Sequence, residues 1–261
     1  MPAINELRLI SNDRPTADEL GSIARSFGLK HVHAALTEIL DTAEKENLTH
    51  SQFLMKLLTA EAFGRYEKKR LRNMSAAHFP AYGELEEYDL NELDSGLTAA
   101  QLSQLKEFNW LDAGSNVLFI GPPGVGKTML AVGLGKKAVQ AGYAVAFERM
   151  TDFIDILDNA ATDKKKGCRL KNIRKCRLLI IDEVGFTPVN AAQANRFFNF
   201  ISSVYLDMSL MFTSNKNVSA WREIFGDKDL TKGLLDRVLG HSRCFELSGT
   251  SYRMKHADRT V

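Results

Sequence analysis

The octet from Gly121 to Thr128 carries the strongest chemical signal in this sequence. It reads Gly-Pro-Pro-Gly-Val-Gly-Lys-Thr, the pattern G-x-x-x-x-G-K-[ST], and lies between an apolar run at 117–120 and a stretch compatible with a helix. A phosphate-binding loop requires that strand–loop–helix setting. The glycines let the backbone turn several N–H groups inward, and the start of the helix adds its positive dipole end. A chance glycine-rich turn is the alternative interpretation.

The polar residues of this octet have predicted roles toward a nucleoside triphosphate, ATP or GTP. We expect the Lys127 ammonium group to reach the β- and γ-phosphates as a point charge, and the Thr128 hydroxyl to bind Mg²⁺. The predicted nucleotide-binding residues are Gly121, Pro122, Pro123, Gly124, Val125, Gly126, Lys127, Thr128 and Met129.

Two carboxylates follow a strongly apolar run further along the chain. The run 178–181 is Leu-Leu-Ile-Ile, and Asp182 and Glu183 come directly after it. All-apolar strands belong to parallel sheets that are covered on both faces, and such sheets bind ligands at the carboxyl ends of their strands. We expect Asp182 to hold Mg²⁺ and Glu183 to orient and deprotonate the attacking water. A solvated acidic turn is the alternative for this motif alone, but with the octet upstream the pair predicts a nucleotide-binding protein.

Size and composition are those of an ordinary soluble globular protein. The 261 residues are 44% hydrophobic and 25% charged, with a net charge of +2. No apolar stretch approaches the roughly 18 residues that span a bilayer, and the N-terminus lacks a signal-peptide core. Cys168, Cys176 and Cys244 form no CxxC pair, which argues against a disulfide framework. We therefore expect a cytoplasmic protein with no membrane partner.

The N-terminal part of the chain reads as a small helical domain at 1–80. Capping-box signals at Thr16-x-x-Glu19 and Thr49-x-x-Gln52 each open an apolar-periodic segment. The following stretch, 81–96, contains acidic residues but no Lys or Arg, so we expect an acidic linker there. The predicted helices of the first domain are 16–28, 31–46 and 49–75.

Strands and helices alternate in the remaining part, 97–261. The crossover segments between strands are long enough for helices, which predicts a parallel sheet. The expected fold class is α/β, with a five-stranded parallel sheet flanked by helices and preceded by the all-α domain. The predicted strands are 117–120, 143–148, 178–182, 209–214 and 244–247, and the predicted helices lie near 127–141, 152–160, 191–206 and 229–241.

Positive charge gathers in two segments of the chain. Cations between residues 65 and 72 recur at spacings of three and four, so they share one helix face, which suits contact with a phosphate backbone without base readout. A solvated face with Glu61 and Glu67 as ion-pair partners is the alternative. The predicted DNA-binding residues are Arg65, Lys68, Lys69, Arg70, Arg72, Lys164, Lys165, Lys166, Arg169 and Lys171.

Two further polar residues lie where they could assist hydrolysis. Asn215 follows the apolar strand at 209–214 and could bind the attacking water or the γ-phosphate, or it could be a simple turn residue. Arg237 lies on a partly buried helix, and its guanidinium group could bind phosphate oxygens as an arginine finger does. An ion pair with Asp236 is the alternative for Arg237.

Taken together, these motifs resemble those of the IstB-like transposition helper ATPases, a family of the AAA+ superfamily close to the DnaC-type helicase loaders. The resemblance runs from about residue 29 to the C-terminus. The motifs that carry it are Ala60-Glu61, Lys68-Lys-Arg-Leu-Arg72, His78-Phe-Pro80, the run 116–128, the run 178–185, Thr213-Ser-Asn215, the run 221–227 and Leu234-Leu-Asp-Arg237.

The resemblance implies further roles for residues of this chain. Asn215 becomes the sensor-1 residue, Arg237 the finger offered to a neighbouring subunit, and Arg253 a candidate sensor-2 residue. It also implies ATP bound at the interfaces of a homo-oligomer, and a domain without the helical lid of many AAA+ proteins.

The function implied by the resemblance is that of an ATPase that helps a transposase. It would assemble on duplex DNA with ATP and promote transposition through target selection and activation of a cognate transposase. The alternative is a DnaC-type loader, whose N-terminal segment would contact a replicative helicase. A small-molecule kinase is disfavoured, because Asn215, Arg237 and the basic helix would have no role there.

Overall fold

The computed structural model describes residues 15–226 and 228–251. The chain forms two compact units, Met1–Leu71 and Arg72–Val261, which divide inside one long helix, α3 (His50–Ala77). The domain limits that we placed at residues 80 and 96 stay predictions. Within the described ranges, no helix is both long and apolar enough to cross a membrane.

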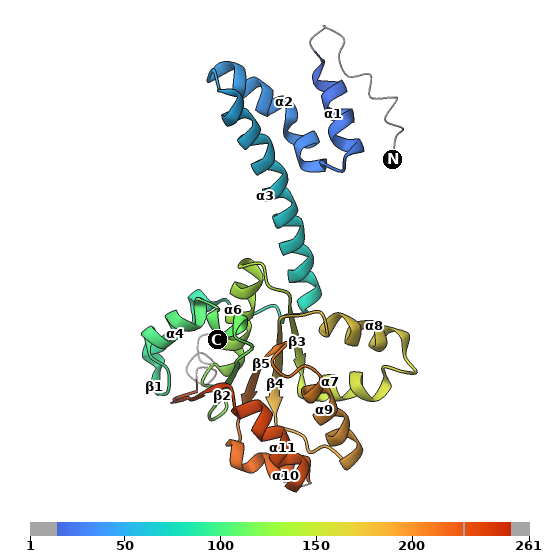
Figure 1. Cartoon of the computed structure of the whole chain (residues 1–261). Helices are drawn as coiled ribbons and strands as arrows, with labels where there is room; N and C mark the ends of the chain where they lie inside the picture. The colour runs from blue at the N-terminus through green and yellow to red at the C-terminus, as the bar shows by residue number, and fades with distance from the viewer. Residues whose placement is uncertain (1–14, 227, 252–261) are drawn as a thin grey trace, which may run out of the picture. The chain divides into compact units, whose positions relative to one another are not determined.

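From residue 15 onward the first unit consists of helices, as predicted. The capping box at Thr16 is present: the Thr16 hydroxyl accepts a hydrogen bond from the Glu19 amide at 3.2 Å, and the Glu19 carboxylate accepts one from the Thr16 amide at 2.8 Å. Val32 and Leu36 are buried in the small core of this unit. The two helices that precede α3 are α1 (Ala17–Ser26) and α2 (Lys30–Lys45), drawn in blue in Figure 1.

Glu61 of α3 holds the start of α2, which has no side-chain cap of its own. Glu61 Oε2 accepts hydrogen bonds from the His31 and Val32 amides at 2.9 and 3.0 Å, and Glu61 Oε1 accepts one from Arg65 Nε at 2.7 Å. Burial opposes ionisation of Glu61, but the bonds from Arg65, Val32 and His31 outweigh it, so the pKa of this carboxyl lies below its ordinary value. The Glu61 carboxylate therefore links α3 to α2 and forms an ion pair with Arg65.

A five-stranded parallel sheet forms the centre of the second unit and confirms the predicted fold class (Figure 1). Successive residues of a strand point to opposite faces: Leu118 and Ile120 enter one hydrophobic core, whereas Val117 and Phe119 enter another. Both faces are buried, as the apolar runs predicted. In spatial order the strands are β3 (Val145–Arg149), β4 (Leu178–Val184), β5 (Ser209–Ser214), β2 (Asn116–Ile120) and β6 (Ser242–Glu246).

Helices cover both faces of this sheet. The core that contains Leu118 is completed by α7 (Met150–Asn159), α8 (Lys164–Ile173), α9 (Ala191–Ser203), α10 (Trp221–Phe225) and α11 (Lys228–Leu239). The core that contains Val117 is completed by α4 (Ala99–Lys106), α5 (Asn109–Asp112), α6 (Lys127–Gln140) and the short 3₁₀ helix Leu85–Glu87. Two more 3₁₀ helices, Leu90–Glu92 and Val218–Ala220, connect elements.

Several elements of the second unit were not predicted, a helix and a pair of short strands among them. Helix α8 covers part of the basic run at 164–177, where charged residues hide the apolar periodicity that would have indicated a helix. Strand β1 (Leu93–Ser95) pairs antiparallel with β7 (Ser248–Gly249), and both are too short to show an alternating pattern.

Asn116 fixes the start of β2 to its neighbours. Its Nδ2 donates a hydrogen bond to the Val238 carbonyl oxygen of α11 at 2.9 Å, and its Oδ1 accepts one from the Leu210 amide of β5 at 2.9 Å. The Asn116 amide donates to the His241 carbonyl oxygen at 2.7 Å. Because Asn116 is buried, water does not compete for these bonds, and the strand that leads into the octet is held to the end of α11.

Arg169 of α8 forms a buried ion pair with Glu148 of β3. Their side chains are 11% and 10% exposed, and Arg169 Nε lies 2.5 Å from Glu148 Oε1. Arg169 also donates to the carbonyl oxygens of Ala76 at 2.6 Å and Ala77 at 3.3 Å, which belong to the last turn of α3, where carbonyl groups lack helical partners. This guanidinium group, which we predicted to contact DNA, thus makes its contacts with protein oxygens.

We predict that Arg169→Ala destabilises the second unit strongly. Removing one member of a buried ion pair leaves the other charge uncompensated and costs about 3–5 kcal/mol of unfolding free energy. The midpoint of thermal unfolding should then fall by on the order of 10 °C for a unit of this size. Lys171→Ala is the control, because Lys171 is exposed on the same helix. Equal unfolding midpoints for the two variants would contradict this account.

Candidate nucleotide-binding site

A cavity of about 390 Å³ lies at the carboxyl ends of β2, β4 and β5. Residues 123–129 line it after β2, Glu183 lines it at the end of β4, and Asn215 lines it after β5. The three sequence motifs that we expected to form one site therefore meet around one cavity, at the edge of the sheet where parallel folds bind ligands.

The phosphate loop links β2 to α6. Gly124 and Gly126 have φ angles of 89° and 84°, in the left-handed region that glycine adopts without a steric penalty. The helix begins at Lys127, so its first amides face the loop. Lys127 Nζ donates hydrogen bonds to the carbonyl oxygens of Gly121 at 2.8 Å and Pro122 at 2.7 Å. The ammonium group thus lies over the loop that an anion would enter.

Asp182 is the most buried charged group of the site. It is 2% exposed, and its Oδ1 accepts hydrogen bonds from the Thr128 hydroxyl at 2.8 Å and the Thr213 hydroxyl at 2.5 Å. A carboxylate and a hydroxyl this close together are oxygen ligands of the kind that Mg²⁺ takes beside a phosphate group. The predicted metal pair, Thr128 and Asp182, therefore fits the ion.

Glu183 has an unusual backbone conformation. Its φ angle is 61°, in the left-handed region, which costs a non-glycine residue on the order of 1–3 kcal/mol. The pairing of β4 with β5 shifts register between Ile181 and Val184, and this bulge exposes the Glu183 side chain at the cavity. The Glu183 amide donates a hydrogen bond to the Thr213 hydroxyl at 3.0 Å.

Thr213 therefore contacts both acidic residues, a role that its place in the motif Thr213-Ser-Asn215 had not indicated. Its hydroxyl donates to Asp182 and accepts from the Glu183 amide, while its side chain lines the cavity and is 1% exposed. A hydroxyl residue directly after the apolar run Leu210–Phe212 was the available signal. We infer that Thr213 stabilises the strained conformation of Glu183.

Arg237 is not among the residues that line this cavity. Its Nη1 donates to the Gly233 carbonyl oxygen at 3.0 Å, and its guanidinium carbon lies 4.9 Å from the centre of the Phe198 ring. Among residues 15–226 and 228–251, no ion pair joins it to Asp236. Arg253 lies outside the described residues.

The segment before the phosphate loop lines the other side of the cavity. Tyr88 Oη donates to the Val125 carbonyl oxygen at 3.3 Å, and a methyl group at Gly126 would lie 2.6 Å from the Tyr88 ring. Burial raises the pKa of Tyr88 to about 12, so its hydroxyl stays protonated. The stretch that we read as an acidic linker thus packs on the loop. The lining residues that sequence reasoning missed here are Tyr82, Gly83, Glu87, Tyr88 and Asp89.

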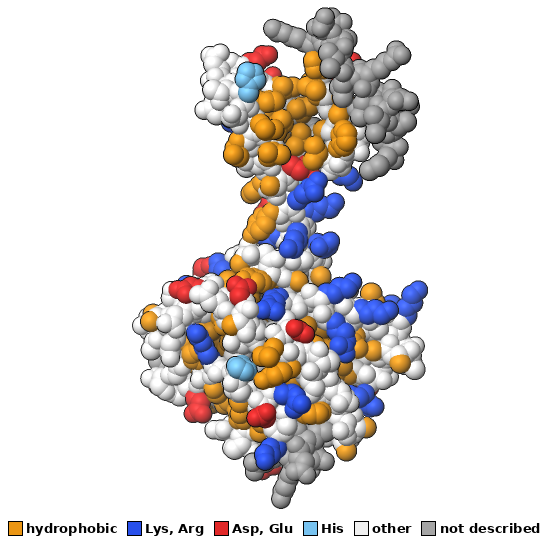
Figure 2. Space-filling model, viewed as in Figure 1, with side chains coloured by type: hydrophobic (Ala, Val, Ile, Leu, Met, Phe, Trp, Pro, Cys, Tyr) orange, Lys and Arg blue, Asp and Glu red, His pale blue; other side chains and the backbone are white. Residues whose placement is uncertain are grey.

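The predicted DNA-binding residues fall into two groups. Figure 2 shows Lys and Arg side chains gathered along α3. Four members pair with carboxylates: Arg65 with Glu61, Arg70 with Glu67, Lys166 with Asp155, and Arg169 with Glu148. Lys68, Lys69, Arg72, Lys164, Lys165 and Lys171 are exposed, and in the part of the chain that the structure describes none of them forms an ion pair.

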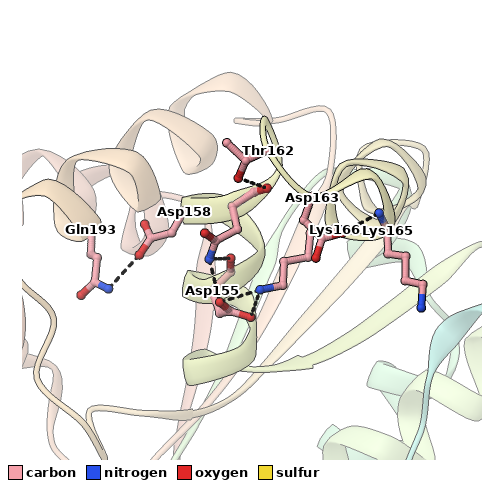
Figure 3. Close-up of polar contacts among 8 residues, drawn as sticks. Asp155, Asp158, Thr162, Asp163, Lys165, Lys166 and Gln193 are labelled. Carbon is pink, nitrogen blue, oxygen red and sulfur yellow. Dashed lines mark hydrogen bonds and ion pairs between the residues drawn. The ribbon is translucent and has the colours of Figure 1, made fainter.

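The corner between α7 and α8 shows why neighbouring lysines differ (Figure 3). Asp163 caps α8, with its Oδ1 accepting from the Lys165 and Lys166 amides at 2.7 and 3.3 Å. The Lys166 side chain turns back to Asp155 at 2.8 Å, whereas the Lys165 side chain points away from this cluster. Asp158 binds Gln193 of α9 at 2.8 Å. The cluster therefore fixes the corner and leaves Lys165 exposed.

Comparison with known proteins relates the chain to insertion-sequence proteins. The profile of the family described as IstB-like ATP binding protein matches residues 22–260. A putative ATP-binding protein of insertion sequence IS21 from Pseudomonas aeruginosa is 33% identical over 237 residues, which cover 91% of this chain and 89% of that protein. An IS21-like putative ATP-binding protein from Bacteroides fragilis is 33% identical over 238 residues, covering 91% and 90%.

Solved structures share the fold at lower identity. The DnaC helicase loader has a TM-score of 0.51 and 21% identity, covering 64% of this chain and 97% of that chain. The replication initiator DnaA bound to AMPPCP and single-stranded DNA has a TM-score of 0.54 and 20% identity, covering 70% and 55%. Both are similar to this chain in fold.

We predict that Thr213→Val impairs the site without unfolding the protein. The variant keeps the shape of the side chain but leaves the Glu183 amide without this partner and Asp182 Oδ1 with the Thr128 hydroxyl alone, a loss of about 1–3 kcal/mol. ATP turnover should therefore fall roughly 5- to 100-fold, while Thr213→Ser, which keeps the hydroxyl, should retain most of it. Steady-state turnover and thermal unfolding measure the two effects. Wild-type turnover in Thr213→Val would show that the hydroxyl does not position Glu183.

Proposed function

Because the chain belongs to the family of IstB-like ATP binding proteins and has an AAA+ fold, we propose that it is an ATP-dependent DNA-binding helper of an insertion-sequence transposase. Its subunits assemble on duplex DNA with ATP, and the assembly promotes transposition through target selection and activation of the transposase. The observation that carries the proposal is that the phosphate loop and Glu183 line one cavity, with the buried Asp182 hydrogen-bonded to Thr128 of that loop. The relatives of the chain are insertion-sequence ATP-binding proteins.

In the proposed reaction, ATP is hydrolysed to ADP and phosphate. Lys127 exchanges the carbonyl oxygens of its own loop for the β- and γ-phosphates. Thr128 and Asp182 would hold Mg²⁺, which would supply positive charge beside those phosphates. Glu183 orients a water molecule and accepts its proton as the water attacks the γ-phosphorus, and Asn215 donates a hydrogen bond to that water or to the γ-phosphate.

Arg237 acts, in this proposal, on the ATP of a neighbouring subunit. Arg237 does not line the cavity of its own chain, which fits a role in trans. A guanidinium group placed on the γ-phosphate stabilises the charge that spreads over the transferred group. Each ATP then lies between two copies of the chain, so that hydrolysis depends on assembly. Arg253 keeps its proposed sensor-2 role.

The exposed cations provide the proposed contact with DNA. Lys68, Lys69 and Arg72 lie on α3, and Lys164, Lys165 and Lys171 lie on α8. Exposed Lys and Arg side chains without carboxylate partners bind phosphate groups at a lower cost than paired ones, because no ion pair has to break first. Such contacts give affinity with little dependence on base sequence, as a protein that samples many target sites requires.

A loader of a replicative helicase is the second candidate. The observation that favours it is the fold similarity to the DnaC helicase loader, of which this chain covers 97%. Sequence favours the first candidate, since identity is 33% to the IS21 protein and 21% to the loader. Co-purification of the chain with a transposase or with a replicative helicase separates the two.

We predict that retention of the protein on duplex DNA depends on ATP. Lys127→Ala should lose the ATP-dependent fraction, because the phosphates lose their nearest point charge. Glu183→Gln should bind ATP and stay on DNA longer than the wild type, because it keeps the metal ligands but cannot accept the proton from water. A duplex pull-down with and without ATP measures both. Equal retention of the wild type and both variants, with and without ATP, would contradict ATP-dependent assembly.

We predict that the unpaired cations of α3 account for part of the salt dependence of DNA binding. Each phosphate contact contributes a slope of about −0.9 to the plot of log affinity against log salt. Replacing Lys68, Lys69 and Arg72 by Ala should flatten this slope by roughly two to three units. Arg70→Ala is the matched control on the same helix, because Glu67 already holds Arg70 at 2.8 Å, and it should change the slope by less than about one unit.

The salt titration also separates the competing accounts. An unchanged slope in the triple variant would remove α3 from the DNA contact and leave α8 as the remaining candidate. Unchanged duplex affinity together with loss of a bound helicase would support the loader function instead.

A further inference from the structure

Phe198 of α9 and Arg237 of α11 form a contact that the proposed reaction has not used. The Arg237 guanidinium carbon lies 4.9 Å from the centre of the Phe198 ring, a distance at which a cation is attracted to an aromatic face. Both residues are partly exposed, so the contact lies at the surface. We propose that Phe198 is the positioning residue of the arginine finger, an inference that rests on the proposed role of Arg237 in trans.

The helix that carries Arg237 is shaped for this contact. Gly233 lies one turn before Arg237, and its carbonyl oxygen accepts a hydrogen bond from Arg237 Nη1 at 3.0 Å. A methyl group at position 233 would lie 3.2 Å from Phe198 Cε2 and 3.5 Å from Arg237 Nη1. The first distance is tighter than ordinary van der Waals contact, so a larger residue would press against the ring. Gly233 therefore gives the ring and the guanidinium group the space to meet.

The type of contact matters because it does not neutralise the charge. Arg196 lies only two residues before Phe198, and it pairs with the Asp158 carboxylate at 2.6 Å. Arg237 is held instead by an aromatic ring and a carbonyl oxygen, and in the described part of the chain no carboxylate pairs with it. A finger must deliver positive charge to a phosphate group, and breaking an ion pair first would oppose that transfer.

The contact contributes to catalysis by ordering the Arg237 side chain before the reaction. An arginine side chain has many rotamers, and fixing them at the moment of reaction opposes transition-state binding. Phe198 and the Gly233 carbonyl restrict those rotamers before a neighbouring subunit arrives. Loss of the ring should therefore lower kcat for ATP and leave its KM unchanged, since Phe198 does not line the cavity of its own chain.

The first measurement is steady-state ATP hydrolysis with saturating duplex DNA. Phe198→Leu keeps the apolar bulk and should lower kcat about two- to fivefold, the range expected from a surface cation–π contact. Phe198→Tyr keeps the ring and should retain wild-type kcat. Arg196→Ala is the control for a nearby arginine on the same helix and should also retain it. Wild-type or raised kcat in Phe198→Leu would overturn the proposal.

The second measurement assigns the effect to the subunit that donates the finger. Lys127→Ala chains can offer Arg237 but hold no ATP, whereas Arg237→Ala chains hold ATP but offer no finger, so mixing them should restore hydrolysis. Adding Phe198→Leu to the Lys127→Ala chain should lower the restored rate. Adding it to the Arg237→Ala chain should not. An equal loss in both arrangements would mean that Phe198 acts only on the fold and would overturn the proposal.

The same set of variants keeps the two failures apart. Wild-type hydrolysis in Arg237→Ala alone, or no restoration at any mixing ratio, would reject the finger in trans, which is the proposed function of Arg237. Normal restoration with no effect of Phe198→Leu on either chain would reject only the positioning role.

Discussion

The buried carboxylate of Asp182 is the group on which the site depends. A carboxylate that is 2% exposed is costly unless hydrogen bonds compensate for the lost water. Two hydroxyls do so here, Thr128 at the start of α6 and Thr213 in β5. One group therefore requires three segments of the chain to meet, and the apolar side chains on both faces of the sheet supply the packing that holds them. Thr128 places the phosphate loop beside Asp182, and Thr213 places Glu183 beside it.

Sequence predicted the parts of this site that depend on local pattern. The octet and the apolar run before Asp182 are local, and strand β4 and helix α6 were predicted from them correctly. Thr213 and Tyr88 depend instead on which strand lies beside which, because each contacts the site from another segment of the chain. Phe198 is similar: its spacing in α9 fits a core position, and only the packing of α11 on α9 brings Arg237 over its ring.

The basic residues illustrate a different limit. Spacing correctly indicates that cations share a helix face, but it does not give their partners. Glu61 and Glu67, which lie on the same helix, occupy Arg65 and Arg70, as the alternative of a solvated face had proposed for this segment. Arg169 differs because its partner Glu148 comes from a strand 21 residues earlier. Its burial follows from the way α8 packs, which composition cannot reveal.

Asn116 links the strand that leads into the phosphate loop rigidly to the helix that carries Arg237. Its side chain joins the start of β2 to α11 one residue after Arg237, and β2 leads directly into the phosphate loop. In the proposed role of Arg237, the cavity of a subunit and the finger that it offers to a neighbour would therefore be linked through the two ends of β2. In the proposed assembly of such subunits, the distance between the cavity and Arg237 would be the same in every copy. A change in the pitch or curvature of the proposed assembly would then arise at the contacts between copies, where we propose that ATP lies, and not by deformation within a copy.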